Sequence, residues 1–244
     1  MGQAAKTQII ECNGLAGCGK TTLTKALKDE LIRTRHRAML FGEAYQIFKE
    51  HPVKNTIRCL KLPLIFQYIR LFLVIGRNKN YTFYFYVRYI YWAAVRISLV
   101  YHWCLKYGEF NYVLCDHGLI QNIISLLGFD ELKNWQKIKQ CLISVIKAES
   151  GIYMVNCNIS IEQSRQRIHI RNKNTGRLDL ISDDMELKKL LQITENNFFT
   201  VRNMVNVVQK EWPIINLEMD KPLETNVQTM LSLLTQGTNK KNEY

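Results

Sequence analysis

Residues 14–21, GLAGCGKT, combine three glycines with one lysine and one hydroxyl side chain. The spacing of Gly14, Gly19, Lys20 and Thr21 fits the pattern G-x-x-x-x-G-K-[ST]. In this pattern the glycines let backbone N–H groups curve around phosphate oxygens, the lysine reaches the outer phosphates and the hydroxyl binds Mg²⁺. The stretch therefore predicts a loop that binds the polyphosphate of a nucleoside triphosphate.

Such a loop needs a buried strand before it and a helix after it. Residues 7–12 are apolar enough for a short strand, and leucines recur along one side of residues 21–33, at Leu23, Leu27 and Leu31. The positive end of that helix dipole would point at the same phosphates. Glycine-rich turns also join strands to helices in proteins that bind no nucleotide, but here strand, loop and helix follow in the required order.

Four further apolar runs, at 37–42, 111–116, 151–156 and 213–218, alternate with helical stretches. This alternation predicts an α/β fold in three layers, a five-stranded parallel sheet flanked by helices. Ligands in such folds bind beyond the carboxyl ends of the strands. The candidate site residues are therefore those that follow each run: residues 14–21, Glu43, Asp116, His117 and residues 156–158.

The chain has 244 residues and a formal net charge of +12. Its length suits one α/β domain, and no linker or repeat indicates a second, so we expect a single domain over 1–244. The positive charge fits nucleic acid, an anionic membrane surface or a polyanionic small molecule. Because basic residues are scattered and no nucleic-acid module accompanies them, we expect a small phosphate-bearing ligand and no sequence-specific nucleic acid.

Cysteine usage and the start of the chain bear on the compartment. The seven cysteines form neither a C-x-x-C pair nor a metal-ligand spacing, which is typical of reduced thiols in an intracellular protein. The first strand begins almost at once and leaves no room for a signal peptide. We expect a cytoplasmic protein.

Residues 57–107 are unusually rich in aromatic and aliphatic side chains. The longest charge-free run, 97–105, is too short to span a bilayer, and Arg88 or Arg96 would each cost roughly 2.5–3.5 kcal/mol at mid-membrane. We therefore expect no transmembrane segment, but a helical insertion that covers the acceptor. Peripheral contact with a bilayer is the alternative. The two arginines are either ion-paired structural residues or ligands for an anionic substrate.

Two charged clusters lie farther along the chain. YVLCD, ending at Asp116, has the form of a strand that delivers a carboxylate to the metal of a nucleotide. In the second cluster, 160–179, Ser160 and Gln163 have capping-box spacing, so a helix that carries arginines should begin there. A mobile arginine-rich lid can close over a triphosphate and neutralise the transferring phosphoryl, whereas a solvated basic helix is the simpler reading. The acidic start of SDDMELKKLL predicts a new helix after it.

The order GLAGCGKTT, LFGEAY, LCDHG, arginine-rich lid and INLEMDKPLETNVQTMLSLL resembles the thymidylate-kinase-like group of nucleoside and nucleotide kinases, which are P-loop NTPases. The resemblance covers most of the chain as a pattern, and only the phosphate loop is highly specific. It implies that the loop holds the phosphates of Mg²⁺-ATP, that lid arginines stabilise the transferred phosphoryl and that the segment after the last strand lies near the donor base.

The expected site follows from this resemblance and from the motifs. The expected ATP-binding residues are Asn13, Gly14, Leu15, Ala16, Gly17, Cys18, Gly19, Lys20, Thr21, Thr22 and Arg177. The expected catalytic residues are Lys20, Glu43, Asp116, Arg165, Arg167 and Arg171. The expected acceptor-binding residues are Glu43, Arg88, Arg96 and His117. The expected Mg²⁺ ligands are Thr21 and Asp116.

The sequence departs from the family pattern at two points. Family members usually carry arginine after the acid of the third strand, whereas this chain has His117 and Gly118. GEAY also lacks the proline that often follows the family's acidic residue. Glu43 is either the base that accepts the acceptor's proton or a structural carboxylate, and Asp116 is the other candidate base. The acceptor could therefore be something other than a standard nucleotide.

Two classes of function fit these observations. The first is an ATP-dependent phosphotransferase that moves the γ-phosphoryl to a small-molecule acceptor, a nucleoside or nucleotide. The second is an ATP-dependent regulatory switch that acts through a protein partner or at a membrane surface. A GTP switch is disfavoured because no N-K-x-D sequence occurs. The exposed-looking aromatic surface could also pack in a homodimer.

Overall fold

The computed structural model describes residues 7–76, 96–127, 135–148, 152–171, 177–208 and 214–239. The strands are β1 (Gln8–Asn13), β2 (Ala38–Leu40), β3 (Tyr112–Cys115), β4 (Ile152–Asn158) and β5 (Ile214–Glu218). The helices are α1 (Lys20–Arg33), α2 (Phe41–Glu50), α3 (Pro52–Cys59), α4 (Leu62–Gly76), α6 (Ser98–Tyr107), α7 (Leu119–Leu127), α8 (Trp135–Ala148), α9 (Ile161–Arg171), α10 (Asp184–Val208) and α11 (Leu223–Asn239), with a short 3-10 helix, η2 (Arg177–Leu180).

The five strands form one parallel sheet in the order β2-β3-β1-β4-β5. β1 is central, with Ile10 opposite Leu114 of β3 and Tyr153 of β4. All carboxyl ends therefore point to one edge of the sheet, and the phosphate loop leaves from its middle. The five-stranded parallel sheet predicted from the sequence is confirmed.

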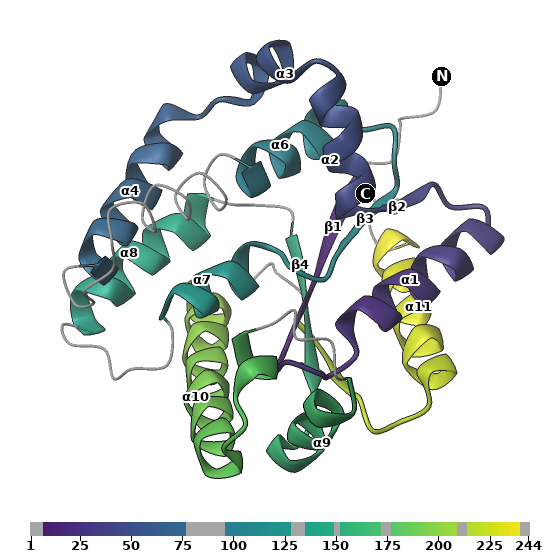
Figure 1. Ribbon diagram of the computed structural model, residues 1–244. Helices are drawn as coiled ribbons and strands as arrows, with labels where there is room; N and C mark the ends of the chain where they lie inside the picture. The colour runs from purple at the N-terminus through teal and green to yellow at the C-terminus, as the bar shows by residue number, and fades with distance from the viewer. Residues whose placement is uncertain are drawn as a thin grey trace.

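Alternate residues of each strand enter two separate cores, which makes three layers. Ile10 and Cys12 pack with leucines of α1 and residues of α11, whereas Ile9 packs with α4, α6, α7 and α8. Figure 1 shows α1 and α11 on one side of the strands and α4, α7 and α8 on the other. The leucine stripe predicted for the first helix is confirmed, because all three leucines are fully buried.

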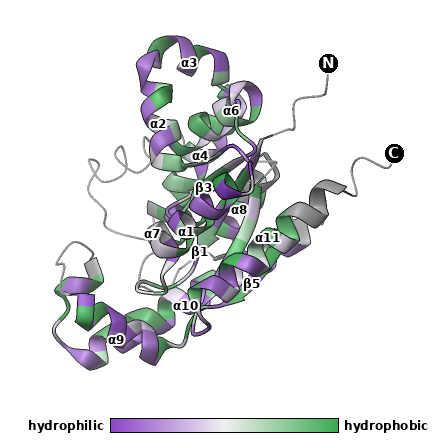
Figure 2. Cartoon of the chain, turned by 90° about the vertical axis from the view of Figure 1, so that its right-hand side faces the viewer, coloured by the Kyte–Doolittle hydropathy of each residue, from purple (hydrophilic) through white to green (hydrophobic). Residues whose placement is uncertain are grey.

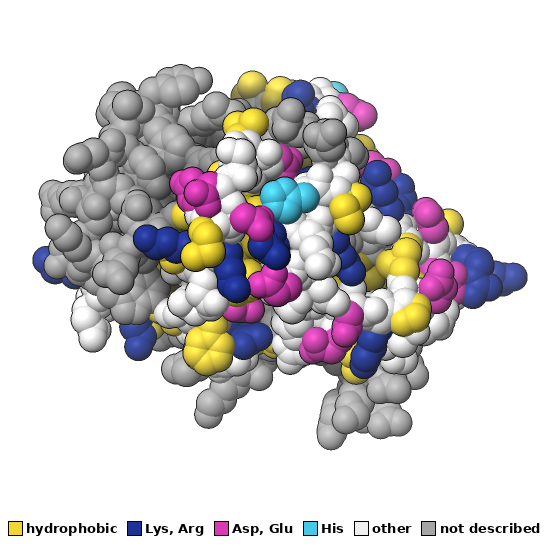
Figure 3. All heavy atoms as spheres, turned by 60° about the horizontal axis from the view of Figure 1, so that its bottom comes forward, with side chains coloured by type: hydrophobic (Ala, Val, Ile, Leu, Met, Phe, Trp, Pro, Cys, Tyr) yellow, Lys and Arg dark blue, Asp and Glu magenta, His cyan; other side chains and the backbone are white. Residues whose placement is uncertain are grey.

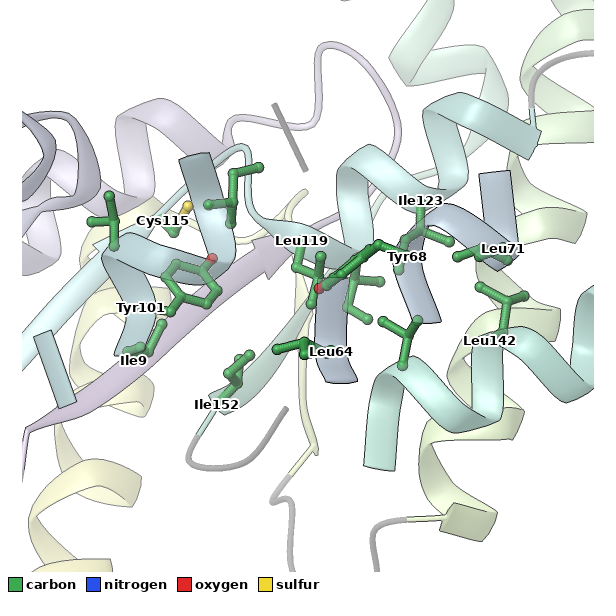
Figure 4. Close-up of a cluster of buried hydrophobic side chains, with 14 of the residues drawn as sticks. Ile9, Leu64, Tyr68, Leu71, Tyr101, Cys115, Leu119, Ile123, Leu142 and Ile152 are labelled. Atoms are coloured by element: carbon green, nitrogen blue, oxygen red, sulfur yellow. The ribbon is translucent and has the colours of Figure 1, made fainter. Parts of the chain in front are cut away.

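The larger core lies under α4, α7 and α8. On one face of α4, Tyr68 and Leu71 lie toward Ile123 of α7 and Leu142 of α8, and Leu64 lies beside Leu119 (Figure 4). These side chains are at most 4% exposed, so their burial contributes much of the hydrophobic stabilisation on this side of the sheet. Among the helices of the described ranges, none is both long enough and apolar enough to cross a membrane.

Two strand limits differ from those expected. β2 ends at Leu40, so Glu43 lies in the first turn of α2 and not in a loop after the strand. The Leu40 N–H donates to Glu43 Oε2 at 2.9 Å, and this contact starts the helix early. β4 extends to Asn158 because its last residues still pair with β5, so Asn156 lies within the strand.

α4 provides a matched pair of leucines for testing this arrangement. Leu71 is fully buried, whereas Leu73, two residues later, is 55% exposed. We expect Leu71→Ala to lower the free energy of unfolding by about 2–5 kcal/mol, since it leaves a cavity in the core. Leu73→Ala should change it by about 0.5 kcal/mol or less. Urea unfolding followed by circular dichroism measures both, and equal losses would contradict the described packing.

Candidate functional site

The phosphate loop, residues 14–21, curls at the end of β1 on glycine backbone geometry. Gly14, Gly17 and Gly19 all have positive φ, at 156°, 75° and 97°. A Cβ on Gly14 would lie 2.5 Å from the carbonyl oxygen of Cys157 in β4, so any other residue would force the loop and β4 apart. The loop is held on its other side by α9, where the Ser164 hydroxyl donates to the Ala16 carbonyl at 2.6 Å.

Lys20 lies inside this loop, at the first residue of α1. Its side chain is buried, and Nζ donates to the carbonyls of Gly14 and Leu15, each at 2.9 Å. No described side chain caps the N-terminus of α1, and its first turn contains no acidic residue. The first N–H groups of the helix and the ammonium group therefore make one electropositive end, which suits an anion.

Asp116, directly after β3, meets the helix that follows the loop. The Thr21 hydroxyl donates to Asp116 Oδ2 at 2.5 Å, although the two residues are 95 positions apart. The sequence predicted both as ligands of one metal ion, and the structure brings them together. Their donors are oxygens only, the type that Mg²⁺ prefers. The described residues contain no group of three or more His, Cys, Asp or Glu side chains that could hold a metal by themselves.

A cavity of about 440 Å³ opens beside this pair and is lined by residues of α1, α2 and β3. Thr21 and Asp116 form one wall, and Glu43 and Gln46 of α2 form another. Lys28 Nζ donates to Glu43 Oε1 at 2.5 Å. Partial burial opposes the ionisation of Glu43, but its bonds to Lys28 and to the Leu40 N–H outweigh this effect and lower the pKa of the carboxyl. Glu43 is therefore ionised at neutral pH.

His117 follows Asp116 at the same edge and has an exposed side chain. Desolvation, with the nearby charge of Lys20, lowers the pKa of His117 despite the opposing effect of Asp116. The imidazole is therefore mainly neutral at neutral pH and does not replace the fixed charge of an arginine.

The arginines of α9 are held by specific partners. α9 begins where Ser160 accepts a hydrogen bond from the Gln163 N–H at 3.2 Å, so the predicted capping-box start is confirmed. Arg167 donates to the carbonyls of Cys18 at 3.5 Å and Met219 at 3.2 Å, so it joins the phosphate loop to the turn after β5.

Arg165 and Arg171, which are expected as arginines of a mobile lid, are both ion-paired with nearby carboxylates. Arg165 pairs with Asp184 at the start of α10 and with Glu162, and Arg171 pairs with Asp179. Figure 3 shows acidic and basic side chains interspersed on the face that includes this end of the molecule. Because these carboxylates already neutralise them, the two arginines carry no unpaired charge toward the loop in this arrangement.

Of the remaining predicted site residues, the side chains of three are described by the structure and those of two are not. Asn13 is buried and its Nδ2 donates to the Glu11 carbonyl at 3.2 Å, while Thr22 is exposed on α1. Arg96 stacks on Tyr45 of α2, with its guanidinium carbon 3.7 Å from the ring centroid. Arg88 and the side chain of Arg177 lie outside the described parts of the chain.

Glu11, in the middle of β1, is the functional-site residue that the sequence reasoning missed. Its carboxylate is fully buried and accepts N–H bonds from Leu119, Ile120 and Gln121 at 2.9, 2.6 and 3.2 Å. The Tyr101 hydroxyl donates to it at 3.3 Å. Glu11 thereby caps the N-terminus of α7 from the sheet. A single acid among the uncharged residues of this strand gives no signal of the contact, because its partners are 90 to 110 positions away along the chain.

Burial decides the ionisation of Glu11. Desolvation raises the pKa of this carboxyl, and the N–H groups of α7 with the Tyr101 hydroxyl lower it, with a net value of about 7. Gly118 is needed beside it, since a Cβ there would lie 2.2 Å from the Glu11 carboxyl carbon. The Glu11 carboxyl therefore fits in this position only because residue 118 has no side chain.

A second cavity, of about 400 Å³, opens beside Asn13, Gly14 and Leu15 at the start of the phosphate loop. It is lined by the ends of β1 and β4 and by one side of α10, including Asn13, Asn158, Phe199 and Arg202. It contains neither Thr21 nor Asp116, so the expected metal ligands open only into the first cavity.

Comparison with known proteins identifies similar structures. No family model matches the chain, and no curated protein sequence matches it. A deoxyadenosine kinase from M. mycoides with bound dATP is 14% identical, with a TM-score of 0.50 over 93% of this chain and 99% of that one. The same enzyme with the products dCMP and a flexible dCDP is 12% identical, with the same TM-score and coverage. At identities this low, the structural likeness concerns the fold alone.

The buried carboxyl of Glu11 predicts a pH-dependent stability. Below about pH 4.5 the Glu11 carboxyl is protonated in both the folded and the unfolded protein. Between about pH 4.5 and 7 it is deprotonated in the unfolded chain but still protonated in the folded protein. The contribution of Glu11 to the free energy of unfolding therefore falls as the pH rises, by roughly 3 kcal/mol in total. The Glu11→Gln variant does not titrate, so the difference in stability, wild type minus variant, should decrease from pH 5 to pH 8. Chemical unfolding at each pH measures it.

The exposed Glu50 gives the control for this experiment. Glu50→Gln should leave the pH profile of the wild type nearly unchanged. Parallel profiles for wild type and Glu11→Gln would show that the carboxyl does not titrate in this interval.

Proposed function

We propose that this chain is an ATP-dependent phosphotransferase that moves the γ-phosphoryl of Mg²⁺-ATP to a hydroxyl of a nucleoside. The observation that carries the proposal is the cavity lined by Thr21, Glu43 and Asp116, which opens where the phosphate loop begins α1. A donor tail on the loop and an acceptor in this cavity would meet at the Thr21–Asp116 pair. Such an arrangement supplies the alignment on which phosphoryl transfer depends.

The donor is held by the loop in this proposal. The backbone N–H groups of residues 14–22 surround the phosphates, and Lys20 exchanges its bonds to the loop carbonyls for bonds to phosphate oxygens. Thr21 and Asp116 hold Mg²⁺, which when bound neutralises charge on the phosphates. Arg167 already contacts the loop and is the lid arginine best placed to approach the donor.

A neutral nucleoside fits the acceptor cavity better than a nucleotide. Among its described lining residues there is no lysine or arginine, and the polar groups include Thr24, Glu43 and Gln46. His117 stands where the family carries an arginine, and its lowered pKa leaves it mainly uncharged at neutral pH. Lys28, the lysine beside this cavity, is already paired with Glu43, so an acceptor phosphate would find little unpaired positive charge there. The similarity in fold to a deoxyadenosine kinase supports the same class of acceptor.

Glu43 is the better placed of the two candidate bases. Asp116 is engaged by Thr21 and is needed for the metal, whereas Glu43 lines the cavity and is kept ionised by Lys28. In the proposed step the nucleoside hydroxyl donates its proton to Glu43 as its oxygen attacks the γ-phosphorus, and ADP leaves. One P–O bond forms and one breaks, so the reaction is balanced.

Lys20→Ala tests the donor site. Because the ammonium stabilises charge on the transferring phosphoryl, the variant should phosphorylate nucleosides at least about a hundredfold more slowly. Lys25→Ala, an exposed lysine one turn further on α1, is the matched control and should keep the parental rate. Mass spectrometry of a deoxynucleoside and ribonucleoside panel with Mg²⁺-ATP measures the products.

Two outcomes would contradict this assignment. A parental rate in Lys20→Ala would rule out the proposed donor site. ATP hydrolysis without any phosphorylated nucleoside would favour the regulatory switch that acts through a partner.

Glu43→Gln tests the base. We expect kcat for the nucleoside to fall by about 10²–10⁴, with a smaller change in KM, since proton transfer belongs to the chemical step. Glu50→Gln on the same helix is the control and should retain kcat. Melting temperatures of both variants separate loss of catalysis from loss of the Lys28 and Leu40 contacts. A folded Glu43→Gln enzyme with unchanged kcat would assign Glu43 a structural role.

A further inference from the structure

Exposed apolar side chains are concentrated on α3, α4 and the turn between them. Six large hydrophobic residues there are between 41% and 71% exposed, namely Val53, Ile57, Leu60, Leu62, Phe66 and Leu73. We call these six residues the α3–α4 surface. Exposed hydrophobic residues elsewhere in the described chain, such as Ile32 and Leu233, are spread over several helices. A concentration of exposed apolar side chains of this kind marks a surface that binds another protein or a membrane.

The spacing shows that these side chains belong to outward faces of the helices. Val53 and Ile57 are four residues apart on α3, and Leu62, Phe66 and Leu73 fall on one side of α4 at positions i, i+4 and i+11. The opposite side of α4 is already used, since Leu64, Tyr68 and Leu71 are buried in the core. The exposed side of α4 is therefore a second apolar face beyond what the fold requires.

The charges in this segment all have one sign. Residues 51–76 contain Lys54, Arg58, Lys61 and Arg70 and no aspartate or glutamate. All four cationic residues are exposed. Apolar side chains bordered by lysine and arginine are typical of helices that lie in the interface of an anionic bilayer. The formal net charge of the chain, +12, adds a long-range attraction to the same surface.

Two other occupants fit these observations less well. A symmetric dimer through the α3–α4 surface would bring together the same four cations of each copy, and residues 51–76 contain no aspartate or glutamate to offset their repulsion. A partner helix needs a groove, and neither of the two cavities described above is lined by a residue of α3 or α4.

We propose that the α3–α4 surface docks the protein on anionic lipid. Figures 1 and 2 show α3 at one end of the molecule and α9, beside the phosphate loop, at the other. Docking through α3 and α4 would therefore leave the loop and the Thr21–Asp116 cavity open to small molecules. The proposal stands on exposure and charge, and it does not depend on the kinase assignment.

Co-sedimentation of the full chain with vesicles tests the proposal. We expect binding to phosphatidylcholine vesicles that contain about one third phosphatidylserine, weaker binding at high salt, and little binding to pure phosphatidylcholine. Lys54→Gln/Arg58→Gln/Lys61→Gln should weaken binding about a hundredfold, from about fivefold for each cation. Ile57→Ser/Phe66→Ser should also weaken it at constant charge.

Matched variants show whether the effect belongs to this surface. Lys25→Gln/Arg37→Gln/Lys189→Gln removes the same number of exposed cations elsewhere, and Ile32→Ser/Leu233→Ser removes exposed apolar side chains from α1 and α11. Both controls should bind nearly as the wild type does. Circular dichroism confirms that each variant is folded.

Three results would overturn the proposal. The first is no binding of the wild type to anionic vesicles at low salt. The second is an equal loss in the control and test charge variants, which would show attraction by net charge alone. The third is a dimer, seen by sedimentation velocity, that Ile57→Ser/Phe66→Ser dissociates, since the surface would then serve self-association.

Discussion

The buried carboxylate of Glu11 joins the two halves of the candidate site. It projects from β1, the strand that leads into the phosphate loop, and accepts the first N–H groups of α7, which follows Asp116 and His117. Gln121 adds a second link, because its side-chain oxygen accepts the Gly14 N–H at 3.4 Å. The spacing between the loop and the β3 edge is therefore set by hydrogen bonds from one helix end. The short contact between Thr21 and Asp116 depends on that spacing.

This arrangement has an energetic cost. A fully buried carboxylate loses its hydration, and the raised pKa of Glu11 shows that the N–H groups and the helix dipole only partly compensate. A neutral residue would avoid the penalty but would leave several helix N–H groups without an acceptor. The chain therefore gives up some stability to fix the site, a pattern common where a structure must position charged groups.

The sequence predicted the parts of the site that depend on local order. The β1–loop–α1 unit carries its own signal in glycine spacing and in the leucine stripe of α1, and Asp116 was expected because it ends an apolar run at the same edge. Contacts between distant segments were not predictable. The ion pair between Arg165 and Asp184 at the start of α10 joins two segments whose pairing no local pattern indicates, and Glu43 lies in the first turn of α2 and not in a loop. One sequence gives no information about which charges pair across such distances.

The pair His117–Gly118 shows how one buried contact changes the chemistry at the surface. Gly118 has no room for a Cβ because the Glu11 carboxyl fills that space, and the three N–H groups that hold Glu11 prevent it from moving aside. The turn after Asp116 is therefore fitted to Glu11 before any substrate binds. The neighbouring exposed position carries His117, whose pKa is lowered by desolvation and by the charge of Lys20, so the imidazole is mainly neutral at neutral pH. The exposed position beside Asp116 therefore carries no permanent cation of its own, and the fixed positive charge that acts on it comes from the buried ammonium of Lys20 in the phosphate loop.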